Sequence, residues 1–327
     1  MSPKPSGDAS DSRTATLLLG ALLLAQLVLH WPLLNDHPYG ARTWRMADTA
    51  AMAPPFVDDH SDRLHPRIDW DRGESGHVQT ELPLYTWAVA FLWAMGSEHP
   101  RTAELLSLVL GLLALFCFFG FARHVLGERR ALFATAWLAF TPLVFYFSGS
   151  MQAESLLLLA SYGALWAWVS HLRSGRPGRL AAWALAISVV LGIKPQNVLL
   201  PVPMLMLARG ATGPGGGSWR GPALAFAAAL VIPALWFWHG HPICLQTHNS
   251  FGIMTSGGAD KFSIGLHLRT PRWWVNVGRD LVPSSCWSRR SRSASGVWRA
   301  AGASATIATS SPGPPWCWFP SACWPRP

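Results

Sequence analysis

Charged residues are scarce in this chain of 327 residues. Asp, Glu, Lys and Arg together make up only 13% of it, about half their share in an average soluble domain. Half of the residues are hydrophobic, and 19 are Trp, a residue that favours the membrane–water interface. The shortage of charge excludes an ordinary soluble domain, and the composition predicts an all-α polytopic membrane protein.

Cysteine is rare as well, and motifs of soluble nucleotide chemistry are missing. The five Cys have no paired metal-ligand spacing, so neither a zinc site nor a disulfide framework is expected. The sequence has no Walker loop, dinucleotide fingerprint or nucleophile elbow. The net charge of +9 does not predict nucleic-acid binding, because the basic residues lie in short loops between apolar runs and at the C-terminal end.

Apolar segments recur along the chain. They lie at about 15–34, 83–96, 103–122, 131–148, 155–172, 180–192, 198–208 and 222–239. The first has no small-residue cleavage site after it, which favours an uncleaved signal anchor. A full crossing needs about 20 residues, so the short segment 83–96, which begins at Pro83, is expected to be a partial or interfacial helix.

These segments divide the chain into three parts. Residues 1–14 are polar and are expected to be a disordered tail, and residues 15–280 form a membrane domain whose first outer loop is 35–82. Residues 281–327 are different: from Pro283 onward the chain has five Arg, no acidic residue, three of the five Cys and no helical period. This composition is typical of a coding sequence read in the wrong frame, and it predicts a disordered, frameshifted or truncated end.

Loop charge predicts the topology, because Lys and Arg favour the cytoplasmic side. If 83–96 does not cross, the Arg clusters near 123–130 and 173–179 both fall inside. The segments 180–192 and 198–208 then form a broken pair that turns outside at Lys194. The loop 35–82, the turn 148–155 and the chain after His239 share that outer face.

The outer loop is rich in acid. Nine of the 17 acidic residues lie between Asp36 and Glu81, and carboxylates are costly near hydrocarbon, so a polar site is expected there. If the chain around Asp48 is helical, Arg45 lies on the same face. Asp48 is then either a general base towards a hydroxyl group or one half of an Arg–Asp pair that holds the loop.

Two further acids, Glu81 and Glu154, lie where apolar segments begin. Each is either part of a site or a carboxylate that offsets a helix dipole. Three cations are candidate phosphate ligands: Arg42, Arg45 and Lys194.

The stretch after the last apolar segment contains His239, His241 and His248. They are either metal ligands or polar residues of the membrane interface. Because their spacing matches no fixed metal motif, the second interpretation is favoured.

The box Ala47-Asp48-Thr49, followed by the box Glu81-Leu82-Pro83-Leu84-Tyr85 behind a first apolar segment, resembles bacterial glycosyltransferase family 39. This group includes the protein O-mannosyltransferases and the aminoarabinose transferases of the C-type glycosyltransferases. The resemblance extends over residues 15–280. It implies a C-type glycosyltransferase-like transmembrane helical bundle with a large first extracytoplasmic loop.

The resemblance also implies a function. A sugar would pass from a polyprenyl-phosphate-linked donor to an acceptor protein, lipid or glycan on the extracytoplasmic face of the bacterial inner membrane. Asp48 would be the catalytic carboxylate, with Glu81 and Glu154 as the further acids of the site. Related enzymes often have Lys directly after the second acid, where this chain has Leu82, so one of the three candidate cations must serve instead. No cofactor and no metal are expected, because the leaving group is already a phosphate.

Two alternatives stay open. A transporter or lipid-binding membrane protein would have internal repeats and acids at mid-membrane, whereas the acids of this chain cluster in a loop and no repeat is evident. The second alternative is an inactive fragment with the transferase architecture.

Overall fold

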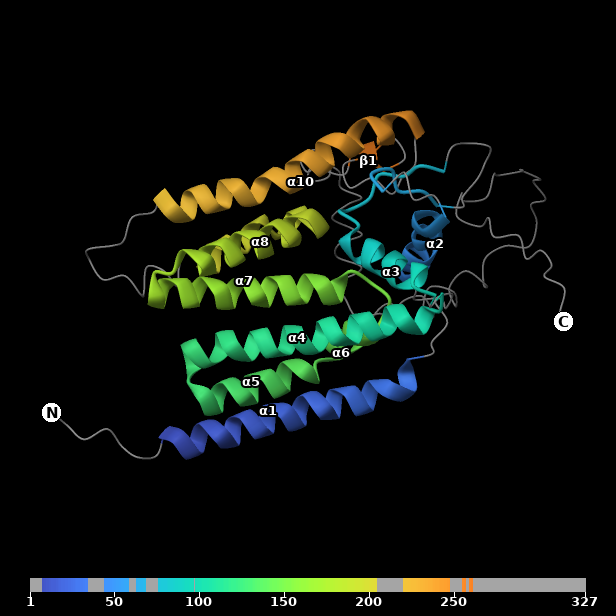
Figure 1. Ribbon diagram of the computed structural model, residues 1–327. Coiled ribbons are helices and arrows are strands. Elements are labelled where there is room, and N and C mark those ends of the chain that lie inside the picture. Colours follow the sequence, from blue (N-terminus) through green and yellow to red (C-terminus); the bar gives the residue numbers. More distant parts are fainter. Residues whose placement is uncertain are drawn as a thin grey trace, which may run out of the picture. The chain divides into compact units, whose positions relative to one another are not determined.

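The computed structural model of the chain is built from α-helices (Figure 1). It describes residues 8–34, 44–58, 63–68, 76–96, 98–204, 220–247, 255–256 and 259–260. Arg42, His248 and the tail 281–327 lie outside these ranges.

The all-α class predicted from composition is confirmed. The helices are α1 (Asp8–His30), α2 (Trp44–Asp58), α3 (Leu84–Ala94), α4 (Pro100–Leu126), α5 (Glu128–Ala139), α6 (Pro142–Gly149), α7 (Glu154–Ser174), α8 (Pro177–Ile193) and α10 (Arg220–Thr247). Two 3-10 turns, η1 (Trp31–Leu33) and η2 (Pro195–Leu199), follow α1 and α8. Near the end of the described chain, β1 (Thr255–Ser256) pairs antiparallel with β2 (Ala259–Asp260).

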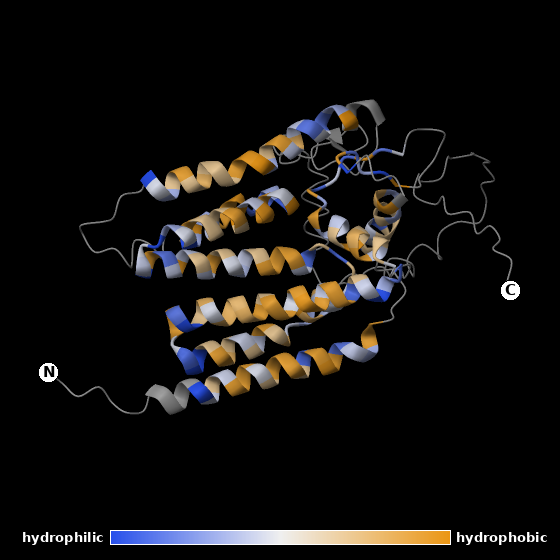
Figure 2. Ribbon diagram, in the orientation of Figure 1, coloured by the Kyte–Doolittle hydropathy of each residue, from blue (hydrophilic) through white to orange (hydrophobic). Residues whose placement is uncertain are grey.

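Several helices are suited to a bilayer by length and composition. Four described helical stretches qualify: Arg13–Leu33, Pro100–Leu126, Glu154–Ser174 and Arg220–Ile243. The pair α5 and α6, which is bent by 68°, makes a fifth if it counts as one span. Large apolar side chains such as Trp137 and Trp238 are about three-quarters exposed, and Figure 2 shows apolar residues along the long helices. A surface this apolar fits contact with lipid, so the polytopic class is confirmed.

Helix α3 is short, as expected for the segment 83–96. Its 11 residues extend over about 16 Å, roughly half the hydrocarbon thickness of a bilayer. It packs against α2 through Val89 and Trp93, and against α4 through Tyr85. The Tyr85 hydroxyl donates to the carbonyl oxygen of Ala103 at 2.8 Å. Helices α2 and α3 therefore form a small apolar unit beside the start of α4.

Two boundaries differ from the sequence prediction. The first helix begins at Asp8, although residues 1–14 were expected to be a disordered tail. The run 131–148 is not one helix: α5 ends at Ala139 and α6 starts at Pro142. Proline has no N–H to continue the helical hydrogen bonds and fits the first turn of a new helix.

The chain reverses after α8, as the broken pair predicted. Lys194 caps α8, and Pro195 begins η2. By Met204 the chain is back beside the middle of the helices: the indole N–H of Trp168 donates to the Met204 carbonyl at 2.8 Å, and that of Trp183 lies 3.0 Å from the Met204 sulfur.

The basic connections α4–α5 and α7–α8 meet at one end of these helices. The Arg173 guanidinium donates to the His124 carbonyl at 2.6 Å, and Arg179 donates to the Ser170 carbonyl at 2.7 Å. Helix α7 carries Arg173 in its last turn and Glu154 as its first residue. Its 21 residues separate the two charges by about 30 Å. The basic cluster and Glu154 therefore occupy opposite ends of the bundle.

Candidate functional site

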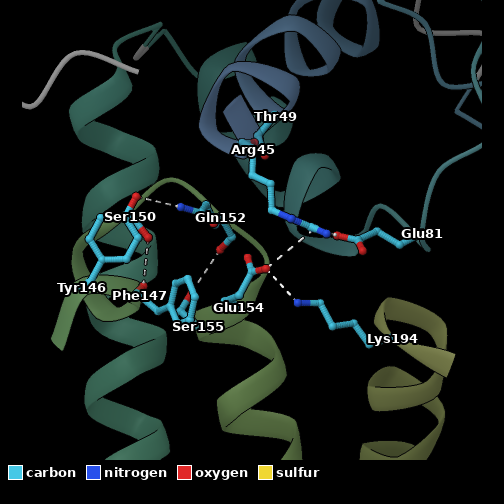
Figure 3. Close-up of polar contacts among 10 residues, drawn as sticks. All are labelled: Arg45, Thr49, Glu81, Tyr146, Phe147, Ser150, Gln152, Glu154, Ser155 and Lys194. Atoms are coloured by element: carbon cyan, nitrogen blue, oxygen red, sulfur yellow. Dashed lines mark hydrogen bonds and ion pairs between the residues drawn. The ribbon is translucent and has the colours of Figure 1, made fainter. Parts of the chain in front are cut away.

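Four charged side chains from four segments converge at the Glu154 end (Figure 3). The Lys194 ammonium Nζ lies 2.9 Å from Glu154 Oε1. The Arg45 guanidinium Nη1 lies 3.7 Å from that same oxygen and 3.5 Å from Glu81 Oε1. One carboxylate oxygen of Glu154 thus faces two cations.

Glu154 and Lys194 are held by the ends of neighbouring helices. Glu154 is the first residue of α7, where the helix dipole favours a negative charge. Lys194 follows the last residue of α8, where the dipole favours a positive charge. Because α7 and α8 pack against each other, the two complementary ends bring the charges together. The Glu154 side chain is only 7% exposed, so this ion pair is largely shielded from solvent.

A backbone hydrogen bond of the neighbouring residue positions Glu81 in the cluster. The next residue, Leu82, donates its backbone N–H to the Gly192 carbonyl at 2.9 Å. A Cβ at Gly192 would lie 2.7 Å from Leu82 Cδ2 and 3.1 Å from Leu82 Cβ, so a larger residue there would force the Leu82 side chain to move. This bond holds the segment before α3 against Gly192, which precedes Lys194 by two residues in the chain.

Arg45 and Asp48 lie in the first turns of α2. The expected helix is present, and residues three apart are neighbours on a helix surface. The apolar side of α2, with Met46 and Phe56, packs on α3. This packing orients Arg45 towards Glu81 and Glu154 (Figure 3), and it leaves Asp48 partly buried one turn further along.

Burial shifts the acid–base properties of this site. It raises the pKa of the Asp48 carboxyl, and the nearby positive charge of Arg45 partly opposes that rise. Burial also raises the pKa of Glu81. Arg45 and Lys194 lower it, while the negative charge of Glu154 raises it further. Both carboxyl groups therefore hold a proton to a higher pH than ordinary side chains do.

Of the six site residues predicted from the sequence, the structure joins four directly: Arg45, Glu81, Glu154 and Lys194. Asp48 shares α2 with Arg45, whose charge acts on its carboxyl group, and Arg42 is outside the described residues.

Sequence reasoning placed the turn 148–155 on the same face as Glu81, but it did not identify the polar contacts inside that turn. The Gln152 amide, which is 5% exposed, donates to the Tyr146 hydroxyl at 3.3 Å. The Ser155 hydroxyl donates to the Gln152 carbonyl at 3.4 Å. The available signal was the polar run around Gln152 between two apolar segments. These bonds hold the turn that presents Glu154.

The histidines do not form a metal site in the part of the chain that is described. Among those residues, no group of three His, Cys, Asp or Glu side chains lies close enough to hold a metal ion. The His239 ring stacks edge-on to His65 with centroids 5.0 Å apart, and its Nε2 donates to the Leu64 carbonyl at 3.2 Å. His239 thus ties α10 to the segment 63–68.

One comparison with known proteins gives a match. Residues 80–238 match the family model described as dolichyl-phosphate-mannose-protein mannosyltransferase. No curated protein and no solved structure matches significantly. The matched segment includes Glu81, Glu154 and Lys194, whereas Arg45 and Asp48 precede it. The resemblance to membrane glycosyltransferases expected from the sequence is therefore confirmed.

Proposed function

We propose that this chain, whose residues 80–238 match a membrane glycosyltransferase family, transfers a sugar from a polyprenyl-phosphate donor to an acceptor hydroxyl group. One observation carries the proposal: two cations from different segments, Arg45 and Lys194, face the same oxygen of Glu154, and the charge of Arg45 also acts on the carboxyl group of Asp48, three residues further along α2. A phosphate leaving group needs cations, and an attacking hydroxyl needs a base.

The cations are suited to a lipid phosphate. Arg binds two phosphate oxygens through its planar fork, and Lys acts as a point charge. With Glu81 and Glu154 both ionised, the four charges of the cluster cancel. Burial favours the neutral form of Glu81, and when this carboxyl group holds its proton the cluster has one net positive charge. That charge attracts an anionic donor.

The reaction is a direct displacement at the anomeric carbon of the sugar. The acceptor oxygen forms a bond to this carbon, and its proton passes to the Asp48 carboxylate. The bond from the anomeric carbon to the phosphate oxygen breaks, and the electron pair leaves with the polyprenyl phosphate. Arg45 and Lys194 stabilise the negative charge that develops there. Glu154 holds both cations in place until the donor arrives.

The distribution of charge supports a site on the extracytoplasmic face of a bacterial plasma membrane. Arg173 and the other Arg residues of the α4–α5 and α7–α8 connections lie at the end opposite Glu154. Short loops rich in Arg favour the cytoplasm. The cluster then lies outside, where lipid-linked sugars meet their protein, lipid or glycan acceptors.

The test uses membranes that contain the full chain, supplied with a panel of radiolabelled polyprenyl-phosphate sugars. Asp48→Asn keeps the size of the side chain but removes the base, so we expect transfer to fall by at least about 100-fold. The control is Asp58→Asn, at the other end of α2 and about 15 Å away by helical rise. This variant should transfer sugar normally.

Membrane insertion is measured for every variant and should not change. Transfer by Asp48→Asn at the wild-type rate would contradict the role of Asp48. If the wild-type chain moves none of the sugars, the alternative of an inactive form is favoured instead.

A further inference from the structure

Gln79 is buried without a hydrogen-bond partner. Its side chain is 1% exposed, and neither amide atom, Nε2 or Oε1, has a partner among the residues that the structure describes. Buried amides are nearly always paired, because an unpaired one has lost its bonds to water and gained nothing in return. An unpaired amide beside a candidate active site therefore calls for a ligand.

Gln79 lies next to the charged cluster. It precedes Glu81 by two residues, and two residues of chain extend over at most about 7 Å. Glu81 in turn contacts Arg45 at 3.5 Å. A ligand that has its phosphate at the cations can therefore place an adjacent group at the Gln79 amide.

Helix α10 covers the amide. A Cβ at Gly240 would lie 2.9 Å from Gln79 Cγ and 3.2 Å from Nε2, so glycine allows the helix backbone to rest directly on this side chain. The Trp236 indole donates to the Thr80 carbonyl at 3.0 Å and fixes the contact. Pro233 and Pro242 interrupt the hydrogen bonds of α10 on either side of Gly240. A bend at Pro233 that breaks the Trp236 and His239 contacts would lift Gly240 from the amide and admit a ligand.

We propose that Gln79 binds two neighbouring hydroxyl groups of the transferred sugar, the amide N–H donating to one and the amide oxygen accepting from the other. This inference rests on the proposed function. The amide is uncharged and both donates and accepts, which suits a sugar hydroxyl pair, whereas Arg45 and Lys194 suit the phosphate. Gln79 is thus a residue that recognises the sugar part of the donor.

A direct binding measurement tests the proposal without requiring turnover. The full chain in detergent is titrated with a short polyprenyl phosphate and with a panel of polyprenyl-phosphate hexoses and pentoses. We expect at least one sugar to add affinity over the bare lipid phosphate. Gln79→Met keeps the length of the side chain but removes both polar atoms. It should weaken that sugar-bearing lipid about tenfold and leave the bare lipid phosphate within about twofold, as expected for lost hydrogen bonds.

Gln26→Met is the matched control. Gln26 is also 1% exposed, and its Nε2 has no partner within the described chain, but it lies on α1. Its replacement should change neither affinity.

A second arm uses donors that lack one sugar hydroxyl group. The wild type should bind the relevant deoxy donor more weakly than the parent, and Gln79→Met should bind both equally. If Gln79→Met binds every lipid as the wild type does, the amide is a packing residue and the inference is wrong.

The same titration separates this inference from the proposed function. If the wild type does not bind bare polyprenyl phosphate, both fall together. If it binds the bare lipid but no sugar adds affinity, only the role of Gln79 is overturned.

Discussion

The ammonium group of Lys194 lies 2.9 Å from the carboxylate of Glu154, and both sit at the ends of helices, α8 and α7. Forty residues separate them in the chain. This ion pair links the ends of α7 and α8, and it also lies in the proposed phosphate site. Its stability and its role in binding can be tested separately.

Removal of Lys194 should destabilise the fold. Lys194→Met leaves the buried Glu154 carboxylate without its nearest cation, and breaking such a pair costs about 3 kcal/mol. Arg45, at 3.7 Å, keeps the cost from rising much further. Thermal unfolding in detergent measures the loss. The double variant Lys194→Met/Glu154→Gln should be less destabilised than the sum of the single variants. Additive effects would mean that the two groups do not interact.

Arg45 should set the pH dependence of transfer. Its charge lowers the pKa of Asp48, against the upward effect of burial. Arg45→Gln removes this influence, so the pKa of Asp48 rises. The base must be ionised to act, and the acid limb of the rate profile should therefore move to higher pH. The position of this limb is read from transfer rates normalised at each variant's maximum.

Arg130→Gln is the control for that profile. Arg130 is exposed in α5, at the basic end of the bundle. Its replacement should leave the limb unmoved, and a downward shift in Arg45→Gln would contradict the assignment of Asp48 as the base.

Close packing of α4 on α7 should depend on Gly120. A Cβ there would lie 2.6 Å from the Trp166 ring, and overpacking of this kind costs about 1–3 kcal/mol. Gly120→Ala should therefore unfold at a lower temperature. Gly163, in α7, has nothing within 4 Å of an added Cβ. Gly163→Ala should be neutral or more stable, because alanine favours helix. Equal effects of the two substitutions would rule out a packing role for Gly120.

Helix α3 should be anchored by one hydroxyl group. The Tyr85 side chain is buried, and its hydroxyl contacts both the Ala103 carbonyl at 2.8 Å and the Ser107 hydroxyl at 2.7 Å. Tyr85→Phe removes both of these hydrogen bonds and should cost about 1–3 kcal/mol. Phe91→Leu, on an exposed side of the same helix, should cost much less. Native-state hydrogen exchange of α3 reports the difference.

Much of the fold was predictable because hydrophobic runs and proline positions are local signals. The spans α1, α4, α7 and α10 fall on predicted apolar segments, and the reversal after α8 falls at Lys194, as expected. The split between α5 and α6 was missed although Pro142 marks it. The residues on both sides of Pro142 are apolar, so hydrophobicity alone predicted one continuous segment over 131–148.

The site was predictable only in part. Loop charge placed Glu81, Glu154 and Lys194 on one face, and the structure joins them. The sequence could not tell which cation pairs with which acid, because that choice depends on how α2 packs on α3. Arg45, three residues before Asp48, forms ion pairs with Glu81 and Glu154 and is not confined to a pair with Asp48. The unpaired amide of Gln79 has no sequence signature, since it arises from the position of α10 above it.

The two charged ends of α7 lie at a fixed distance from each other along the helix. The Glu154 carboxylate is held by Lys194, and the Arg173 guanidinium is held by the His124 carbonyl. These contacts restrict how far either charged group can move from its end of the helix. Their separation of about 30 Å matches the hydrocarbon thickness of a typical bilayer. A thicker membrane must thin around α7, and a thinner one must tilt it. Bilayer thickness therefore sets the depth of the Glu154 end, and with it the height above the hydrocarbon of the two cations that form the proposed phosphate site.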